Sequence, residues 1–214
     1  MRVAIAGGHG QIALRLSRRL SERGDQVVAL IRNPEHAEDV GQVGAEPAVI
    51  DLEHADAEEV AAAIVNADAV VFAAGAGPGS GSARKETMDY GGAVKLVAAA
   101  EQAGVRRYVI VSSMGADADA PGDDTFSVYL RAKGRADDAV RSSGLDFTVV
   151  RPGGLTNDSG TGRVRIGESL PRGQVPRDDV AAVLVAVLDA PNTVGRTFDL
   201  IGGDTPVQEA VAAL

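Results

Sequence analysis

Tyr129 and Lys133 are four residues apart in the segment "YLRAK", a spacing that places both side chains on one face of a helix. An ammonium group beside a phenol favours the phenolate, so Tyr129 could act as a general acid or base near neutrality. Ser112 and Ser113 follow the apolar run "YVIV" and could offer a hydroxyl to a carbonyl oxygen. Together these residues suit hydride transfer from a nicotinamide to a carbonyl carbon, with Tyr129 protonating the oxygen. The alternative is a tyrosine and a lysine on the exposed face of an amphipathic helix.

A glycine-rich turn lies near the start of the chain, between the apolar run "RVAIA" and an amphipathic run. Gly7, Gly10 and Ala13 form the pattern G-x-x-G-x-x-A. The first glycine permits a sharp turn, the second lets backbone N–H groups approach a pyrophosphate, and the small third residue lets helix and strand pack closely. This position after a strand and before a helix favours a dinucleotide site over a packing turn without a ligand.

Arg32 ends the second apolar run, in "ALIRNP". An NAD site usually has Asp or Glu there for the ribose hydroxyls, whereas an arginine suits the 2′-phosphate of NADP. The segment has no acidic residue before Glu35, so the sequence predicts NADP as the cofactor. The alternative for Arg32 is a solvated arginine at a strand end.

Short apolar runs alternate with helical periods through the first part of the chain, which is the order of a doubly wound α/β sheet, or Rossmann fold. The predicted strands are "RVAIAG", "QVVALI", "PAVIDL", "DAVVFAAG", "RRYVIVSS" and "DFTVVRPG". The predicted helices span residues 11–23, 56–66, 84–103 and 126–143. The ligand crevice of such a sheet lies at the carboxyl ends of its strands.

Residues 151–176 are rich in glycine and proline, and a helix over 177–188, the strand "RTFDLIG" and a short helix are predicted to follow. No linker separates these parts, so we expect one domain over 1–214, with a core of about 1–150. The remainder, about 151–214, is expected to fold over the sheet edge on the substrate side. The segment "GAGPGSGS", residues 75–82, is predicted to be a mobile loop at the crevice mouth.

Composition narrows the classes of partner. The net charge of -9 argues against nucleic acid and anionic membranes and favours a small-molecule substrate. The chain has no cysteine, which excludes disulfides and thiolate metal sites, and its three histidines lack metal-ligand spacing, so no metal is expected. No apolar run is long enough for a bilayer span, and we predict a cytoplasmic protein whose oligomeric state is open.

The motifs "GGHGQIA", "AGAG", "YVIVSSMGA", "YLRAK" and "VVRPGGLT", in this order, resemble an atypical short-chain dehydrogenase/reductase of the NAD(P)H-binding, NmrA-like group, which is also similar to flavin and biliverdin reductases. The resemblance covers nearly the whole chain. It implies an NADP-dependent oxidoreductase or epimerase-like enzyme acting on a small carbonyl, quinone or flavin acceptor.

The resemblance also implies roles for individual residues. The implied cofactor contacts are Gly7, Gly10, Gln11 and Ile12 at the pyrophosphate, Arg32, Asp51 and Leu52 at the adenosine, Ala73, Ala74, Gly75 and Lys133 at the riboses, and Pro152, Gly153, Gly154 and Leu155 at the nicotinamide. The implied catalytic set is Tyr129, Lys133, Ser113 (or Ser112) and Asp89. Asp89 stands where the family has an asparagine, and its charge would alter the proton relay. This departure leaves a second hypothesis open, a non-catalytic NADP(H) sensor that acts through a protein partner.

Overall fold

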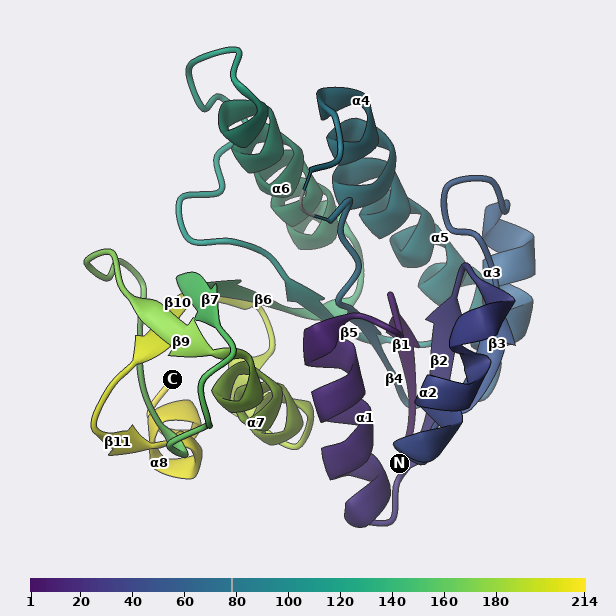
Figure 1. The fold of residues 1–214 in the computed structure, drawn as a ribbon, viewed down its shortest axis with the longest axis horizontal. Coiled ribbons are helices and arrows are strands. Elements are labelled where there is room, and N and C mark those ends of the chain that lie inside the picture. Colours follow the sequence, from purple (N-terminus) through teal and green to yellow (C-terminus); the bar gives the residue numbers. More distant parts are fainter. Residues whose placement is uncertain (78) are drawn as a thin grey trace.

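A mostly parallel sheet with helices on both faces forms the centre of the protein (Figure 1). A computed structural model describes residues 1–77 and 79–214. Within these residues nine strands form one sheet in the order β11-β8-β10-β6-β5-β4-β1-β2-β3, and β7 pairs with β9 apart from it. The predicted doubly wound α/β class is confirmed.

The six strands predicted before residue 152 are all present. The strands are β1 (Arg2–Ala6), β2 (Gln26–Ile31), β3 (Glu46–Val49), β4 (Ala69–Phe72), β5 (Arg107–Val111), β6 (Asp146–Pro152), β7 (Gly154–Thr156), β8 (Arg163–Gly167), β9 (Gln174–Pro176), β10 (Arg196–Gly202) and β11 (Thr205–Pro206). The helices are α1 (Gln11–Glu22), α2 (Ala37–Gln42), α3 (Ala57–Ala63), α4 (Ser82–Arg84), α5 (Ala93–Ala103), α6 (Thr125–Ser142), α7 (Arg177–Leu188) and α8 (Val207–Ala212), with short helical segments η1 (Pro34–His36), η2 (Lys85–Gly92) and η3 (Pro191–Thr193).

Alternate side chains of each central strand enter two separate cores, as the period of an extended strand requires. In β1, Val3 and Ile5 pack on one face of the sheet against α1 and α7. Ala4 and Ala6 face the other side, where α3, α5 and α6 cover the sheet. The strands are therefore apolar on both faces, which explains their unbroken hydrophobic runs.

The helix predicted over residues 84–103 is not a regular α-helix along its whole length. Its first part, η2, is a π-helical segment, and regular α-helix begins only at Ala93. Single π-helical turns occur often at functional sites, since the extra residue per turn redirects side chains. Here Asp89 is buried, and its Oδ2 accepts a hydrogen bond from the Ala76 N–H at 3.2 Å.

The segment after Pro152 adds strands to the sheet, which corrects the expectation that it folds over the edge. β10 pairs with β6 in parallel, and β8, which contains "RVRIG", pairs with β10 in the antiparallel direction. β11 then pairs with β8. β7 and β9 do not join this sheet and pair with each other. The predicted loop 75–82 includes Pro78, which lies outside the described residues, and α4 takes up its last residue.

Gly7 combines a left-handed backbone with a close backbone contact, so its replacement tests the tight turn. Its φ is +80°, and an added Cβ would lie 2.6 Å from the Ala74 Cα. Gly104 ends α5 with φ +71° and has nothing within 4 Å of such a Cβ. We expect Gly104→Ala to lower the free energy of unfolding by about 1–2 kcal/mol through backbone strain. Gly7→Ala should cost about 1–3 kcal/mol more because of overpacking. Urea denaturation measures both variants. Equal losses in the free energy of unfolding for Gly7→Ala and Gly104→Ala would show that the turn at Gly7 tolerates a methyl side chain.

Candidate functional site

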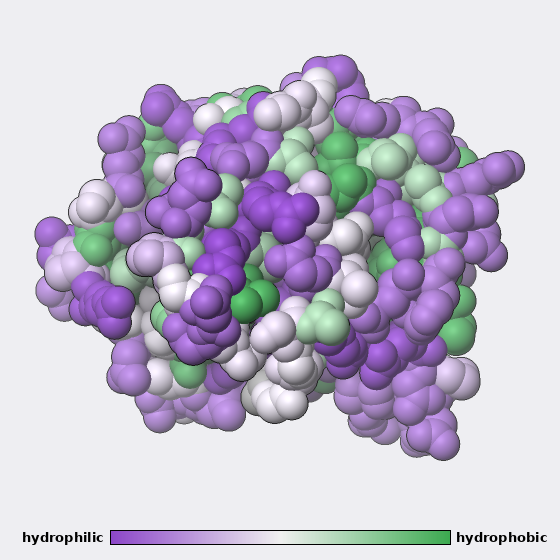
Figure 2. Space-filling view, turned by 90° about the horizontal axis from the view of Figure 1, so that it is seen from above, coloured by the Kyte–Doolittle hydropathy of each residue, from purple (hydrophilic) through white to green (hydrophobic). Residues whose placement is uncertain are grey.

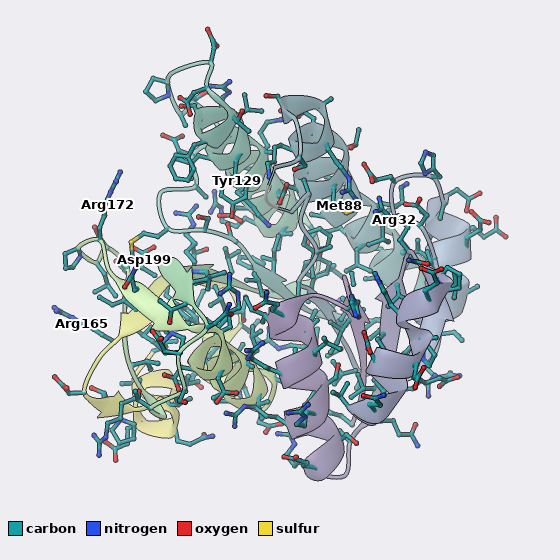
Figure 3. The ribbon with its side chains drawn as sticks, in the orientation of Figure 1. Arg32, Met88, Tyr129, Arg165, Arg172 and Asp199 are labelled. Carbon is teal, nitrogen blue, oxygen red and sulfur yellow. The ribbon has the colours of Figure 1, made fainter. Side chains whose placement is uncertain are left out.

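Three cavities form one crevice along the carboxyl ends of the strands. They measure about 450, 500 and 540 Å³. We call the first the adenosine-side cavity, after the part of the cofactor that the resemblance implies there, and the other two the central and extension-side cavities. The first two share Ala73, Ala74, Gly75 and Gly77, and the last two share Phe126, Tyr129 and Leu155. In Figure 3, Arg32, Met88, Tyr129 and Arg172 follow one another from right to left along the crevice. Figure 2 shows the molecule from above, with small apolar patches in a mostly hydrophilic surface.

The glycine-rich turn borders the first two cavities. Gly7 and Gly10 line the adenosine-side cavity, and Ile12 lines the central one. The Gly10 N–H donates to the Gly7 carbonyl at 2.8 Å, which closes the turn just before Gln11 begins α1. Gly10 is the N-cap residue and has no side chain to cap the helix, and the first turn of α1 has no acidic residue. The free N–H groups and the helix dipole therefore suit an anion such as a pyrophosphate.

Arg32, which the sequence predicts as a cofactor residue, lines the adenosine-side cavity, and an acidic side chain lies beside it. Its Nη1 lies 3.4 Å from Glu53 Oε2, and that carboxylate also accepts from Arg84 Nε at 3.0 Å and Thr87 Oγ1 at 2.6 Å. Burial opposes ionisation of Glu53, but hydrogen bonds from Thr87 and Arg84 outweigh it and hold the Glu53 pKa below its ordinary value. An ionised Glu53 therefore lies beside Arg32.

Of the two other residues implied at the adenosine, only Leu52 lines this cavity. The Asp51 carboxylate instead accepts from the Glu53 N–H at 2.9 Å and contacts the His54 ring at 3.0 Å. Sequence reasoning missed Arg84 and His36, which also line the cavity. Their proximity depends on the packing of distant segments, and no local pattern marks it.

Lys133 and Asp89 form a buried ion pair at the central cavity. Lys133 Nζ lies 3.3 Å from Asp89 Oδ1 and donates to the Val111 carbonyl at 3.2 Å. Their side chains are 5% and 1% exposed. The Lys133 ammonium also lies 5.9 Å from the centre of the Tyr129 ring, and the Lys85 ammonium lies 5.4 Å from the centre of the same ring. The structure thus brings Tyr129, Lys133 and Asp89 together, as the resemblance implied.

The two serines have different surroundings. Ser113 is half-buried, lines the extension-side cavity with Tyr129, and donates to the Met114 carbonyl at 3.3 Å. Ser112 borders the central cavity but is buried, and its Oγ has no hydrogen-bond partner among the described residues. Ser113 is therefore the more accessible hydroxyl. Residues Pro152, Gly153, Gly154 and Leu155 line the same cavity as Ser113.

A second buried ion pair lies behind Ser112 and was missed by sequence reasoning. Asp137 of α6 is fully buried, and its Oδ2 accepts from Arg151 of β6 at 2.8 Å. Burial raises the Asp137 pKa, although the Arg151 guanidinium acts in the opposite direction. This pair joins α6, which carries Tyr129 and Lys133, to the strand that leads into Pro152.

Neither a metal site nor a membrane-crossing helix is found in the described part of the chain. No group of three or more potential ligand side chains gathers there to hold a metal ion. No described helix has the length and hydrophobicity that a bilayer crossing needs. The cytoplasmic location stays a prediction.

Several known proteins are similar to this chain over all or nearly all of its length. The model of the NAD(P)H-binding family matches residues 7–191. The uncharacterized sugar epimerase YhfK of Bacillus subtilis is 39% identical over 215 residues, covering 100% of both chains. The structure of a putative NAD-dependent epimerase/dehydratase from Bacillus halodurans superimposes with a TM-score of 0.92 at 38% identity, over 100% of both chains. ChuY, an anaerobilin reductase from Escherichia coli O157:H7, has a TM-score of 0.80 at 27% identity over 95% of this chain and 98% of its own.

Proposed function

Because the chain belongs to the NAD(P)H-binding family, within the atypical short-chain dehydrogenases/reductases of the NmrA-like group, we propose that it is an NADP(H)-dependent oxidoreductase acting on a small carbonyl, quinone or flavin acceptor. One observation carries the proposal: Tyr129 lines both the central and the extension-side cavity, with the Lys133 ammonium 5.9 Å from its ring. A proton donor at this junction would face a substrate on one side and a cofactor on the other.

The residues of the crevice fit a dinucleotide. The first turn of α1 offers backbone N–H groups without a competing acid, and an added Cβ at Gly7 would collide with Ala74. Arg32 and Arg84 line the adenosine-side cavity and bring two positive charges to the single Glu53 carboxylate beside them. In this proposal Gly10, Gln11 and Ile12 hold the pyrophosphate, and residues 73–75 border the riboses.

Each group of the proposed active site has a defined task. The bound nicotinamide supplies the hydride. Tyr129 gives a proton to the carbonyl oxygen as that oxygen gains charge, and Ser113 donates a hydrogen bond to the same oxygen. Lys133 stabilises the negative charge that Tyr129 acquires on giving up its proton and binds the ribose, while Asp89 holds the Lys133 ammonium at 3.3 Å. Leu155 and Phe126 line both cavities and offer apolar contacts to a substrate there.

Cofactor choice gives the first test. Arg32 is half-exposed and lies 3.4 Å from Glu53, whose carboxylate has closer donors in Arg84 and Thr87. We therefore propose that Arg32 binds the 2′-phosphate of NADP(H). In calorimetric titrations, Arg32→Ala should weaken NADPH binding by roughly tenfold to hundredfold, the value of a charge-assisted contact, and leave NADH binding nearly unchanged. Arg106→Ala, which removes an exposed arginine paired with Asp146, is the matched control.

The titrations test two things separately: which nucleotide the protein prefers, and whether it binds a nucleotide at all. Equal affinity for NADPH and NADH, unchanged in Arg32→Ala, would contradict NADP preference and assign Glu53 to the ribose hydroxyls instead. Failure of both nucleotides to bind would remove the oxidoreductase proposal. Steady consumption of NADPH with carbonyls, quinones or flavins would support the reductase, whereas conversion of a sugar without net consumption would support an epimerase.

A non-catalytic NADP(H) sensor is the second candidate, and the Asp89–Lys133 pair favours it. Lys133 Nζ is engaged by a carboxylate and by the Val111 carbonyl, which reduces its capacity to activate Tyr129. A sensor should distinguish NADP+ from NADPH in binding and should consume neither with any acceptor. Efficient reduction of one small acceptor would exclude it.

A further inference from the structure

The extension-side cavity differs in charge from the protein around it. The chain carries a net charge of -9, yet the residues lining this cavity include Arg172 and Arg177 and, among the described residues, no acid. Neither guanidinium has a carboxylate within 4.0 Å in the described part of the chain. Two unneutralised arginines at one cavity are suited to bind an oxyanion.

Arg177 is held by a neutral partner that leaves its charge available. It is half-buried at the start of α7, and its Nη1 donates to the Asn157 side-chain carbonyl at 2.9 Å. An amide fixes the direction of the guanidinium without cancelling its charge. The remaining N–H groups can therefore donate to a bound anion.

Arg172 is exposed, but the loop that carries it is anchored on both sides. Before it, the Leu170 N–H donates to the buried Asp199 carboxylate of β10 at 3.1 Å. After it, the Gly173 carbonyl accepts from the Gly154 N–H at 2.9 Å. In Figure 3, Arg172 extends upward toward the level of Tyr129, whereas Arg165 projects outward. The anchored loop lowers the entropy that would be lost when Arg172 binds a ligand.

The rest of the cavity wall is mainly apolar. Phe126 and Leu155 are among the large apolar side chains that stay exposed, at 57% and 38%, and both also line the central cavity. Leu130 and Met114 continue the apolar wall, and Ser113 and Tyr129 supply hydroxyl groups. The cavity therefore combines an apolar wall, two hydroxyls and two cationic groups.

We propose that the acceptor of this enzyme is a carboxylate-bearing carbonyl compound with an apolar body. Arg172 and Arg177 bind the carboxylate, the wall formed by Phe126 and Leu155 contacts the body, and the carbonyl lies at Tyr129 and Ser113. This inference rests on the proposed oxidoreductase function and names the class of substrate. Arg172 and Arg177 are specificity-determining residues, since they touch the part of the acceptor that does not react.

The test compares benzoylformate with its uncharged methyl ester. Both are titrated calorimetrically into the protein with and without NADP+, and both are assayed as acceptors with NADPH. We expect benzoylformate to bind at least roughly tenfold more tightly than the ester, and Arg172→Gln and Arg177→Gln each to reduce that binding roughly tenfold. Ester binding should stay unchanged in both variants. Arg165→Gln, an exposed arginine of the same extension outside the cavity, is the control and should behave as the parent.

The two readouts distinguish failure of the inference from failure of the proposed function. Arginine-dependent binding of benzoylformate without turnover of either compound would keep the carboxylate site and count against the reductase. Turnover of the ester equal to that of the acid, unaffected by both replacements, would overturn the inference and leave the reductase intact. Absence of saturable benzoylformate binding, or an equal loss in Arg165→Gln, would also overturn the inference.

Discussion

Replacing Tyr129 with phenylalanine is expected to lower kcat for NADPH-dependent carbonyl reduction roughly 10²–10⁴-fold, the usual contribution of a general acid. The replacement removes only the hydroxyl, and the ring keeps its contacts with Phe126 and the two lysine ammonium groups. The Kd for NADPH should therefore change little. Stopped-flow or steady-state assays of the purified variant, together with calorimetry of NADPH binding, measure both quantities.

Tyr90→Phe is the matched control for this experiment. Tyr90 lies on η2, where its ring stacks under the Arg135 guanidinium at 3.9 Å, and it lines none of the three cavities. It should keep parental kcat. Full carbonyl reductase activity in Tyr129→Phe would contradict the tyrosine mechanism. Loss of carbonyl reduction with flavin or quinone reduction retained would assign the enzyme to acceptors that need no protein acid.

Local sequence patterns predicted the elements that hold the crevice. The unbroken runs of β1 and β5 are apolar because both faces of these strands are covered, and this signal needs no knowledge of partners. The turn at Gly7 is equally local, since its left-handed φ and the start of α1 depend on adjacent residues. Tyr129 and Lys133 share one helix, so their spacing alone fixed their common face.

Features built from distant segments could not be predicted in the same way. Glu53, Arg32 and Arg84 come from three segments that are far apart in the sequence. The lack of an acid next to Arg32 in the sequence therefore gave no sign of Glu53. The Asp137–Arg151 pair depends on how α6 packs against β6. The path predicted for residues 151–214 was wrong for a related reason. β10 pairs with β6, which is far away in the sequence, and no local pattern marks that pairing.

The asparagine-to-aspartate departure at Asp89 can be tested by a double-mutant cycle with Lys133. Lys133→Met leaves the Asp89 carboxylate, 1% exposed, without its cation. Breaking a buried pair by removing one partner costs about 3–5 kcal/mol, so we expect a loss of this size in the free energy of unfolding. Asp89→Asn should cost less, because an amide oxygen can still accept from the Ala76 N–H and lie beside Lys133.

The double variant Asp89→Asn/Lys133→Met tests whether the two side chains stabilise the fold through each other and whether Lys133 is needed for turnover. It leaves no buried charge unpaired, so urea denaturation should show part of the stability lost in Lys133→Met restored, through a favourable coupling of up to about 3 kcal/mol. Turnover should stay absent, since the buried Lys133 ammonium is then missing beside Tyr129 and only the Lys85 ammonium remains near its ring. A double variant as unstable as Lys133→Met would show that the lysine stabilises the fold through Val111 and Phe72 and not through Asp89. Restored stability with restored turnover would contradict the proposed role of Lys133 in activating Tyr129.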